Sequence, residues 1–150
     1  MIKYNGVIFM SFMDYFPKLI LASIIGIIIG YERGNRRNSQ IGTGTTSILV
    51  LGATLLTIIS KYCLGGGDVS RLIANIITAV GFLCGSVIFL KHSDDDPEVV
   101  GLTTGATLFT LTGVGIAIGL GYYELAITST LLIEFNIFVS RQIKKRNKMK

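Results

Sequence analysis

Long apolar stretches separated by short polar segments make up most of this chain of 150 residues. Each stretch holds about 20 residues, which is the length that an α-helix needs to cross the hydrocarbon core of a bilayer. The pattern predicts an all-α fold, a polytopic membrane bundle of five transmembrane helices. The predicted helices are Tyr15–Tyr31, Ile41–Ser60, Leu72–Leu90, Gly101–Gly121 and Tyr122–Ser140.

The composition agrees with a membrane protein. Hydrophobic residues make up 50% of the chain and charged residues 15%, whereas soluble domains carry about 25% charged residues. We divide the chain into an N-terminal extension (1–14), a transmembrane domain (15–140) and a basic tail (141–150). The basic residues gather at membrane edges, so the net charge of +5 does not indicate nucleic-acid binding.

The basic residues also predict the orientation of the bundle. Arg33, Arg36 and Arg37 follow the first helix, and the tail 141–150 adds a second basic cluster. The positive-inside rule places both clusters in the cytoplasm, which requires an even number of spans between them. Five helices satisfy this, with the N-terminus outside and the C-terminus in the cytoplasm. Lys18, inside the first stretch, is expected to extend outward from a helix end.

Glycines spaced four residues apart favour close packing of membrane helices. Residues at this spacing lie on one helix face, where glycine lets two backbones approach. We expect plain packing there, with a gating or partner-binding groove as the alternative. The candidates are Gly26, Gly30, Gly81, Gly85, Gly101, Gly105, Gly115 and Gly119.

Threonines gather where the second and fourth predicted helices begin. A hydroxyl in a membrane helix can bond back to a carbonyl one turn earlier, which makes it inexpensive to bury. Self-satisfied hydroxyls at tight contacts are one interpretation. The other is a polar vestibule facing the cytoplasm, formed by Thr45 on the second helix with Thr103 and Thr104 on the fourth.

A polar face opens the third predicted helix. Arg71 and Asn75 lie on one side of the helix, and Asp68 precedes the arginine by three residues. A charge at the membrane edge is costly unless it is paired, so we expect an ion pair between Asp68 and Arg71. This pair either anchors the helix at the interface or forms the outer lip of an ion or partner site.

Glu134 places a carboxylate inside the last apolar stretch. Such a residue is a functional candidate, because charge is costly within the bilayer. The alternative is a structural glutamate near the cytoplasmic edge, paired with Arg141 or with an arginine of the first loop. The acidic loop Asp94–Glu98 is a solvated connection or, alternatively, a site that attracts Mg²⁺. We find no P-loop and no catalytic arrangement of side chains, so we expect no enzyme activity, no cofactor and no metal site.

Five short segments stand at helix ends in a fixed order. They are Gly30-Tyr31-Glu32-Arg33, Ile41-Gly42-Thr43-Gly44-Thr45, Asp68-Val69-Ser70-Arg71 with Asn75, Gly81-Phe82-Leu83 with Val87-Ile88-Phe89, and the run from Gly101 to Leu108. In order, spacing and helix placement they resemble the MgtC/SapB family of membrane proteins, over about Leu19 to Ser140. The chain departs from the family pattern at Gly44 and Val100, where the family has arginines, and near Leu90, where it has another. Lys91 is able to replace the arginine near Leu90.

The resemblance implies a five-helix protein of the bacterial inner membrane with a cytoplasmic C-terminal end. It also implies a role in growth at low Mg²⁺ and in bacterial survival inside host cells, and some members act on the F-type ATP synthase. We expect a short form that lacks the ACT-like C-terminal domain of longer members.

Our main hypothesis is a non-enzymatic protein that regulates a membrane complex or ion homeostasis. We expect the lipid bilayer to be its first partner, and the resemblance implies the F-type ATP synthase as a second. A further option is a homo-oligomer, in which the glycine grooves let the chain act as an assembly scaffold. Glu32 and Arg33 form an ion pair at the inner edge in this hypothesis, while Asp68, Arg71 and Asn75 form the outer polar face. The alternative is a small channel or transporter for Mg²⁺ or a similar ion that uses Glu134.

Overall fold

The computed structural model describes residues 2–4, 7–9, 11–34, 42–63, 68–91 and 98–147. Five helices lie within these residues, and each is long and apolar enough to cross a membrane, α2 being counted together with the π-helical turn η1 that continues it. This confirms the predicted all-α membrane bundle. The helices are α1 (Phe12–Gly34), α2 (Thr43–Ile58) with η1 (Ile59–Cys63), α3 (Val69–Ser86), α4 (Leu102–Leu120) and α5 (Tyr123–Asn147).

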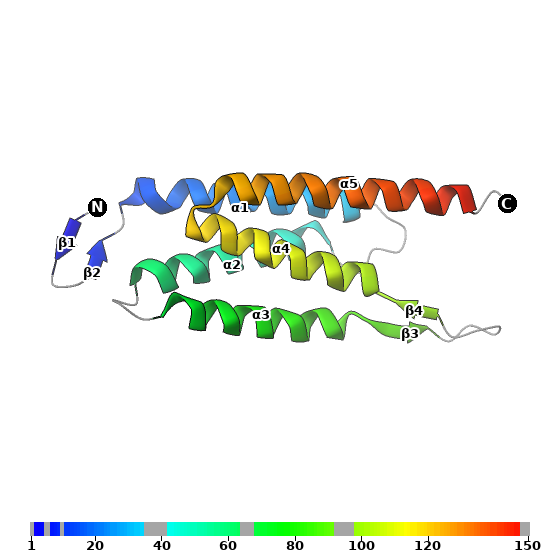
Figure 1. Ribbon diagram of the computed structural model, residues 1–150, viewed down its shortest axis with the longest axis horizontal. Coiled ribbons are helices and arrows are strands. Elements are labelled where there is room, and N and C mark those ends of the chain that lie inside the picture. The colour runs from blue at the N-terminus through cyan, green and yellow to red at the C-terminus, as the bar shows by residue number, and fades with distance from the viewer. Residues whose placement is uncertain are drawn as a thin grey trace.

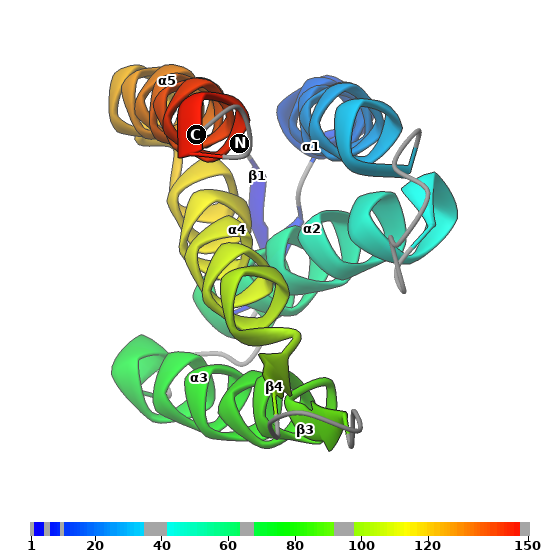
Figure 2. The same cartoon turned by 90° about the vertical axis from the view of Figure 1, so that its right-hand side faces the viewer.

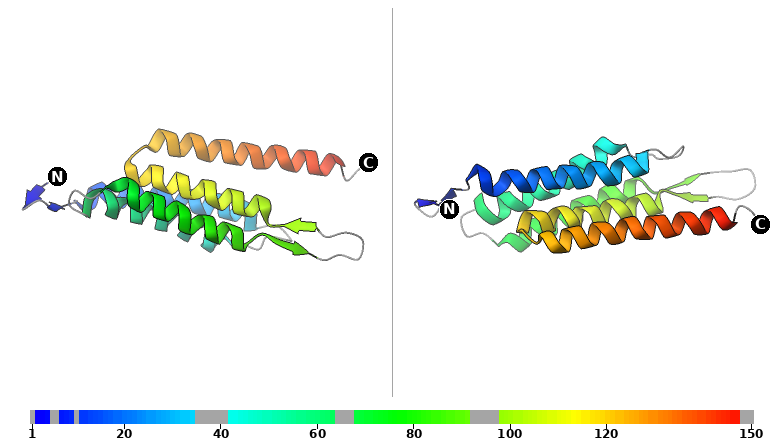
Figure 3. Two further views of the ribbon diagram at one scale, coloured as in Figure 1. Left: turned by 60° about the horizontal axis from the view of Figure 1, so that its bottom comes forward. Right: turned by 90° about the horizontal axis from the view of Figure 1, so that it is seen from above.

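The helices run along one common direction, and the two termini lie at opposite ends of the bundle (Figure 1). Seen end on, α2 and α4 lie between α3 on one side and the pair α1 and α5 on the other (Figure 2). Burial follows this order, because 61% of the span is buried in α4 and 39% in α2, but only 17% in α3 and 11% in α5. The left view of Figure 3 places α3 and α5 at opposite margins, and with so little of each span buried these two helices expose most of their apolar surface.

Glycines explain how closely the inner helices pack. A Cβ atom added at Gly115 of α4 would lie 2.6 Å from the carbonyl oxygen of Val50 on α2, and one at Gly119 would lie 2.6 Å from Cβ of Thr57. Gly26 in α1 is equally close to α2, with 2.5 Å between its added Cβ and Cα of Ser47. Gly30 against Thr43 and Gly105 against Cys84 make the same kind of contact.

Two of the candidate packing glycines make no such contact. An added Cβ at Gly81 or Gly85 of α3 would meet no described atom within 4 Å. Gly101 serves a different purpose, because its φ of 92° is left-handed and favours glycine at the entry to α4. The grooved face of α3 is therefore not used for packing within the described part of this chain.

The break between α4 and α5 follows from Gly121. Its φ of 95° is left-handed, and its N–H donates to the carbonyl oxygens of Ala117 and Ile118 at 3.1 and 3.0 Å. This is the usual way in which a glycine ends a helix. The predicted division of the long apolar run at Gly121 is confirmed.

Two short antiparallel hairpins accompany the helices. Strands β1 (Ile2–Tyr4) and β2 (Val7–Phe9) precede α1, and β3 (Phe89–Lys91) pairs with β4 (Glu98–Val100) between α3 and α4. The predicted third helix, which ran to Leu90, was therefore too long, because α3 ends at Ser86. The last two residues of the predicted helix, Phe89 and Leu90, pair instead with Val100 and Val99 of β4.

The last helix is longer than predicted. It continues beyond Ser140 to Asn147, so the first residues of the basic tail are helical. Arginine, glutamine and lysine are good helix formers, which allows this extension. As a result, Arg141 lies on the last helix, where it contacts Glu32 near the end of α1.

Candidate functional site

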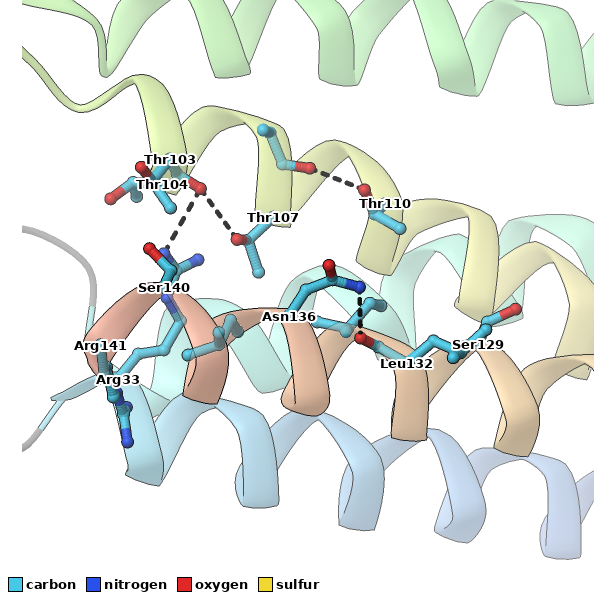
Figure 4. A pocket seen from close by; sticks show the side chains of 13 residues that line it. Arg33, Thr103, Thr104, Thr107, Thr110, Ser129, Leu132, Asn136, Ser140 and Arg141 are labelled. Atoms are coloured by element: carbon cyan, nitrogen blue, oxygen red, sulfur yellow. Dashed lines mark hydrogen bonds between the residues drawn. The ribbon is translucent and has the colours of Figure 1, made fainter. Parts of the chain in front are cut away.

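A polar cavity of about 660 Å³ lies between α4 and α5, at the end of the bundle where α1 ends and α4 begins (Figure 4). We call it the α4/α5 cavity. We call the end of the bundle that holds Arg33 and Arg141 the arginine end, and the opposite end, with Lys18 and Lys61, the lysine end. The cavity is lined by Arg33, Thr103, Thr104, Ala106, Thr107, Thr110, Ser129, Leu132, Ile133, Asn136, Ile137, Ser140 and Arg141.

Helical spacing explains why these side chains meet. Ser129, Asn136 and Ser140 recur at intervals of about one or two turns and therefore share one face of α5. Thr103, Thr107 and Thr110 do the same on α4. Thr103 and Thr104 were predicted as candidates from the sequence, but the polar residues on one face of α5 were not, although their helical spacing in the sequence indicates a shared face.

Arg33 brings α1 to the cavity. Its side chain is buried, with 8% exposed, and its Nη2 donates to the carbonyl oxygen of Thr103 at 3.3 Å. The hydroxyl of Thr107 donates to the same carbonyl oxygen at 2.8 Å, as Figure 4 shows. A guanidinium is thus held at the first turn of α4, within the cavity lining.

Arg141 supplies the second guanidinium. It forms an ion pair with the carboxylate of Glu32, and its Nη2 also donates to the backbone carbonyl oxygen of Glu32 at 3.3 Å. The predicted pairing of Glu32 with Arg33 is therefore replaced by one between α1 and α5. This role of Arg141 was not predicted from the sequence, because the predicted last helix ended at Ser140, one residue before it.

Most buried hydroxyls of the bundle are satisfied within their own helix. Thr107 and Thr112 on α4 donate to carbonyls one turn earlier, as do Thr54 and Thr57 on α2, and the exposed Thr110 does the same. Other hydroxyls of the cavity differ from them. Those of Thr104, Ser129 and Ser140 make no hydrogen bond to any described protein atom, and neither does that of Thr103, whose backbone carbonyl alone accepts bonds.

The charge of the cavity is positive. Among the described residues, its lining holds the two arginines Arg33 and Arg141 and no Asp or Glu, and the carboxylate of Glu32 pairs with Arg141 from outside the lining. The N-terminal end of α4 adds to this charge, because the first amides of a helix lack intrahelical partners and carry partial positive charge. The cap residue Gly101 offers no side-chain hydrogen bond to these amides. The site therefore favours an anionic group over a cation.

A second polar group lies at the lysine end. Lys18 is buried with 5% exposed, and its ammonium donates to the carbonyl oxygen of Gly119 at 3.0 Å. Lys61 donates to the carbonyl oxygen of Leu120, and both ammonium groups lie about 5 Å from the ring centre of Tyr62. The expectation that Lys18 extends outward was wrong, because it satisfies carbonyls at the end of α4 instead.

The polar residues at the start of α3 lie apart from the cavity. Asp68 is the N-cap of α3 and accepts a hydrogen bond from the backbone N–H of Ser70 at 2.9 Å. Hydrogen bonding from Ser70, first through its side chain and then through its backbone, lowers the pKa of Asp68. The expected ion pair with Arg71 is absent among these described side chains, since Asp68 caps the helix. Arg71 and Asn75 are exposed.

Two further candidate residues lie outside the cavity lining. Thr45 is exposed on α2. Glu134 on α5 has a buried Oε1 atom without a hydrogen-bond partner in the described structure. Its expected structural partner Arg141 is bonded to Glu32 instead. Glu134 thus keeps an unsatisfied carboxylate oxygen within a membrane-spanning helix.

Some predicted features fall outside the described residues. They include Arg36, Arg37 and the acidic loop before Glu98, and also the side chains of Leu90 and Lys91. Within the described part of the chain, no three His, Cys, Asp or Glu side chains form a group that could hold a metal ion.

Five apolar helices with a polar cavity at one end define a multi-pass helical membrane protein. The comparison with family models gives the particular family. The model of the MgtC family matches residues 19–146, which is most of the chain, and the chain therefore belongs to the MgtC family.

Individual relatives agree with this assignment. The chain is 37% identical to Protein SapB of Bacillus subtilis over 142 residues, which cover 87% of the chain and 60% of the relative. It is 32% identical over 141 residues to YhiD of Escherichia coli K12, whose name is that of a putative magnesium transporter, covering 89% of the chain and 63% of the relative. It is also 32% identical to Protein MgtC of Salmonella typhimurium over 124 residues, covering 83% of the chain and 51% of the relative.

The chain thus spans between about half and two thirds of the length of these relatives. No solved structure gives a significant match to it.

Proposed function

We propose that this protein acts in Mg²⁺ homeostasis in the bacterial inner membrane by regulating a membrane complex or ion balance, without catalysing a reaction. Family membership and the name of the relative YhiD support the link to Mg²⁺. The F-type ATP synthase is the partner complex to test first, because it is the partner that the family resemblance implies.

The proposed orientation places the N-terminus outside and the arginine end in the cytoplasm. Arg33, Arg141 and the helical part of the basic tail all lie at that end, and the positive-inside rule favours the cytoplasm for such a cluster. The α4/α5 cavity then faces the cytoplasmic side of the membrane, where an anionic partner or ligand could reach it.

The charge of the cavity carries the proposal. Mg²⁺ binds carboxylates and water oxygens, and the described lining contains two arginines and no Asp or Glu. Such a cavity is a poor path for Mg²⁺ and a good site for an anionic group. A regulatory binding site agrees better with this chemistry than a magnesium channel through the same cavity.

Complementation of a strain that lacks the gene tests this function. The wild-type chain should restore growth at limiting Mg²⁺, and Arg33→Gln should not, because Arg33 holds one of the two cavity charges. Arg146→Gln is the matched control, since it removes the same charge from an exposed position on α5 that does not line the cavity.

Membrane abundance of each variant is measured alongside growth. Full restoration by Arg33→Gln at wild-type abundance would discard the cavity as the working site. Crosslinked purification from the complemented strain then tests the partner, and subunits of the F-type ATP synthase should be recovered with the wild-type chain. Their absence would remove that complex as the partner.

A small ion channel or transporter is the second candidate function. It is favoured by Glu134, whose unsatisfied carboxylate oxygen lies buried inside a membrane-spanning helix. Liposomes that contain the purified chain should then show a Mg²⁺ flux that Glu134→Gln abolishes. Silent liposomes, together with growth that depends on Arg33, would favour the regulatory function.

A further inference from the structure

We infer, independently of the proposed function, that the outer face of α3 is the contact surface between two copies of this chain. The copies pack side by side about a two-fold axis along the membrane normal. Helix α3 lies at one margin of the bundle (Figure 2), and only 17% of its span is buried within the chain. The surface includes the polar residues at the start of α3, which do not line the α4/α5 cavity.

Small side chains form a continuous line along this outer face. Thr78 and Gly85 follow Arg71 at intervals of seven residues, and Ala74 and Gly81 lie seven residues apart beside them. A repeat of seven residues keeps one face of a helix in contact with a parallel partner helix along its whole length. Small residues on that face allow the two backbones to approach closely in a membrane.

The line of small residues faces away from the rest of the chain. Arg71, Ala74, Thr78 and Gly85 are exposed, and an added Cβ at Gly81 or Gly85 would meet no described atom within 4 Å. The buried residues of α3 lie on the other side of the helix and are Ile76, Val80 and Cys84. The face is therefore open for a second helix without any change in the fold.

Arg71 has no carboxylate partner among the described side chains of its own chain. Residues 64–67, which lie outside the described part, are a leucine and three glycines and offer no carboxylate either. Asp68 caps α3 through Oδ1, and a carboxylate accepts more than one hydrogen bond. Side chains of a helix lean toward its N-terminus, so Arg71 of one copy reaches the level of Asp68 of the second copy.

Asn75 adds an amide that needs a partner. It is exposed, makes no hydrogen bond to a described atom, and lies about 9 Å along α3 from its first residue. An unbonded amide is costly in lipid. Ser70 flanks the line of small residues on the side opposite to Asn75, and flanking positions of opposite sides meet in a parallel pair of helices. The amide of Asn75 can therefore donate to the hydroxyl oxygen of Ser70 of the second copy.

The same relation joins two apolar side chains further along the helix. Ile77 flanks the line on the side of Ser70, and Phe82 flanks it on the side of Asn75. Both are exposed, Phe82 to 79% and Ile77 to 40%. Phe82 of one copy would cover Ile77 of the other. Polar groups therefore meet polar groups at the start of α3, and apolar groups meet apolar groups further along it.

These pairs identify the occupant of the face as a second copy of the chain. Copies of a membrane protein share one orientation, so two of them can place α3 against α3 only in parallel and at equal depth. A two-fold interface needs a surface that complements itself. Every contact then occurs twice, and the three contacts are Asp68 with Arg71, Ser70 with Asn75, and Ile77 with Phe82.

Förster transfer between donor- and acceptor-labelled copies of the full chain in liposomes measures dimerisation, at a series of protein-to-lipid ratios. Gly85→Leu should weaken dimerisation by about tenfold or more, because the added side chain separates the two helices. Asn75→Leu should weaken it by about threefold to tenfold, since it removes the interhelical hydrogen bond.

Gly113→Leu is the matched control. It makes the same substitution at an exposed glycine of α4 that also has no described atom within 4 Å of its added Cβ. It should leave dimerisation within about twofold of the wild type. The helix content of each variant, measured by circular dichroism, should equal that of the wild type because none of these side chains enters the core.

An exchange of charges tests whether Arg71 and Asp68 meet between copies. Asp68→Arg and Arg71→Asp should each dimerise weakly alone, because each places like charges together. A mixture of the two variants restores both opposite-charge pairs in the mixed dimer. Transfer between the two variants should therefore indicate dimerisation about threefold or more stronger than that of either variant alone.

A monomer at every protein-to-lipid ratio would leave this face to lipid or to a helix of another protein, and would overturn the inference. Equal dimerisation by the wild type and Gly85→Leu would also overturn it, as would an equal loss in Gly113→Leu. If Gly85→Leu weakens dimerisation but the charge-exchange mixture does not restore it, the result supports the face and contradicts the contact between Asp68 and Arg71.

Discussion

The guanidinium of Arg141 on α5 pairs with the carboxylate of Glu32 on α1, across 109 positions of the sequence. The pair links the two helices at the arginine end, where Arg33 joins α1 to α4. Three helices are thereby tied together around the mouth of the α4/α5 cavity. Their relative positions at this end depend on polar contacts as much as on packing.

A double-mutant cycle measures how strongly this pair holds α1 to α5. Glu32→Gln and Arg141→Gln should each lower the free energy of unfolding, and the coupling between them should be about 1 kcal/mol, because both side chains are about one third exposed. Unfolding of the reconstituted chain in a denaturing detergent provides the free energies. Strictly additive effects would show that the pair contributes nothing to stability.

Gly115→Ala should destabilise the bundle. The added methyl group would come within 2.6 Å of the carbonyl oxygen of Val50, so α2 and α4 must separate, at a cost of about 1–3 kcal/mol. Gly113→Ala is the matched control on the same helix, because no described atom lies within 4 Å of its added Cβ. It should be neutral or slightly stabilising, since alanine favours helix. Similar melting temperatures for the two variants would contradict this contact.

Lys18→Met should lower the free energy of unfolding by about 1–2 kcal/mol, because it removes a buried charged donor from the carbonyl oxygen of Gly119. Lys61→Met is the comparison, since Lys61 also bonds to the end of α4 but is exposed, and its loss should cost less. Both are measured by detergent unfolding. A larger loss for Lys61→Met would reverse this ranking.

Asp68 should make stability depend on pH in the acidic range. Its pKa is lower in the folded chain because of hydrogen bonds from Ser70, so its contribution is present above about pH 4 and is lost as the pH falls through the folded pKa. The difference in melting temperature between the wild type and Asp68→Ala should therefore shrink toward pH 3. Asp68→Asn should keep the cap without this pH dependence. A constant difference at every pH would contradict the assignment.

Glu134→Leu should raise stability by about 1–3 kcal/mol, because the buried carboxylate oxygen has no partner to offset its loss of hydration. Thermal unfolding of the purified chain provides the measurement, with Thr128→Leu, an exposed position on α5, as the control for added apolar surface. Unchanged or lower stability would indicate that Glu134 has a favourable contact in the folded protein.

Much of the fold could be predicted from the sequence, because a bilayer imposes helix length and hydrophobicity directly. The break at Gly121 was visible for the same reason, since the run from Gly101 to Ser140 is too long for one span. The end of α3 could not be predicted in this way, because the strand Phe89–Lys91 continues the apolar run of the helix. Hydrophobicity alone cannot separate a short buried strand from the end of a helix.

The candidate site was predictable only in part. Thr103 and Thr104 stood out as polar residues at a helix start, but their association with Arg33 and Arg141 depends on which helices are neighbours. The same limit explains Lys18, whose partner at Gly119 belongs to a helix far along the chain. Spacing shows which residues share a face, and it does not show which face of another helix they meet.

The short connection between α4 and α5 determines how these helices enter a bilayer. Only Gly121 and Tyr122 separate them, so the two helices form a tight hairpin. We expect the pair to enter the bilayer together, with the turn at Gly121 crossing the hydrocarbon first. The N–H of Gly121 in this turn donates to carbonyl oxygens of α4. Fewer peptide groups therefore lack hydrogen bonds while the turn is in the hydrocarbon.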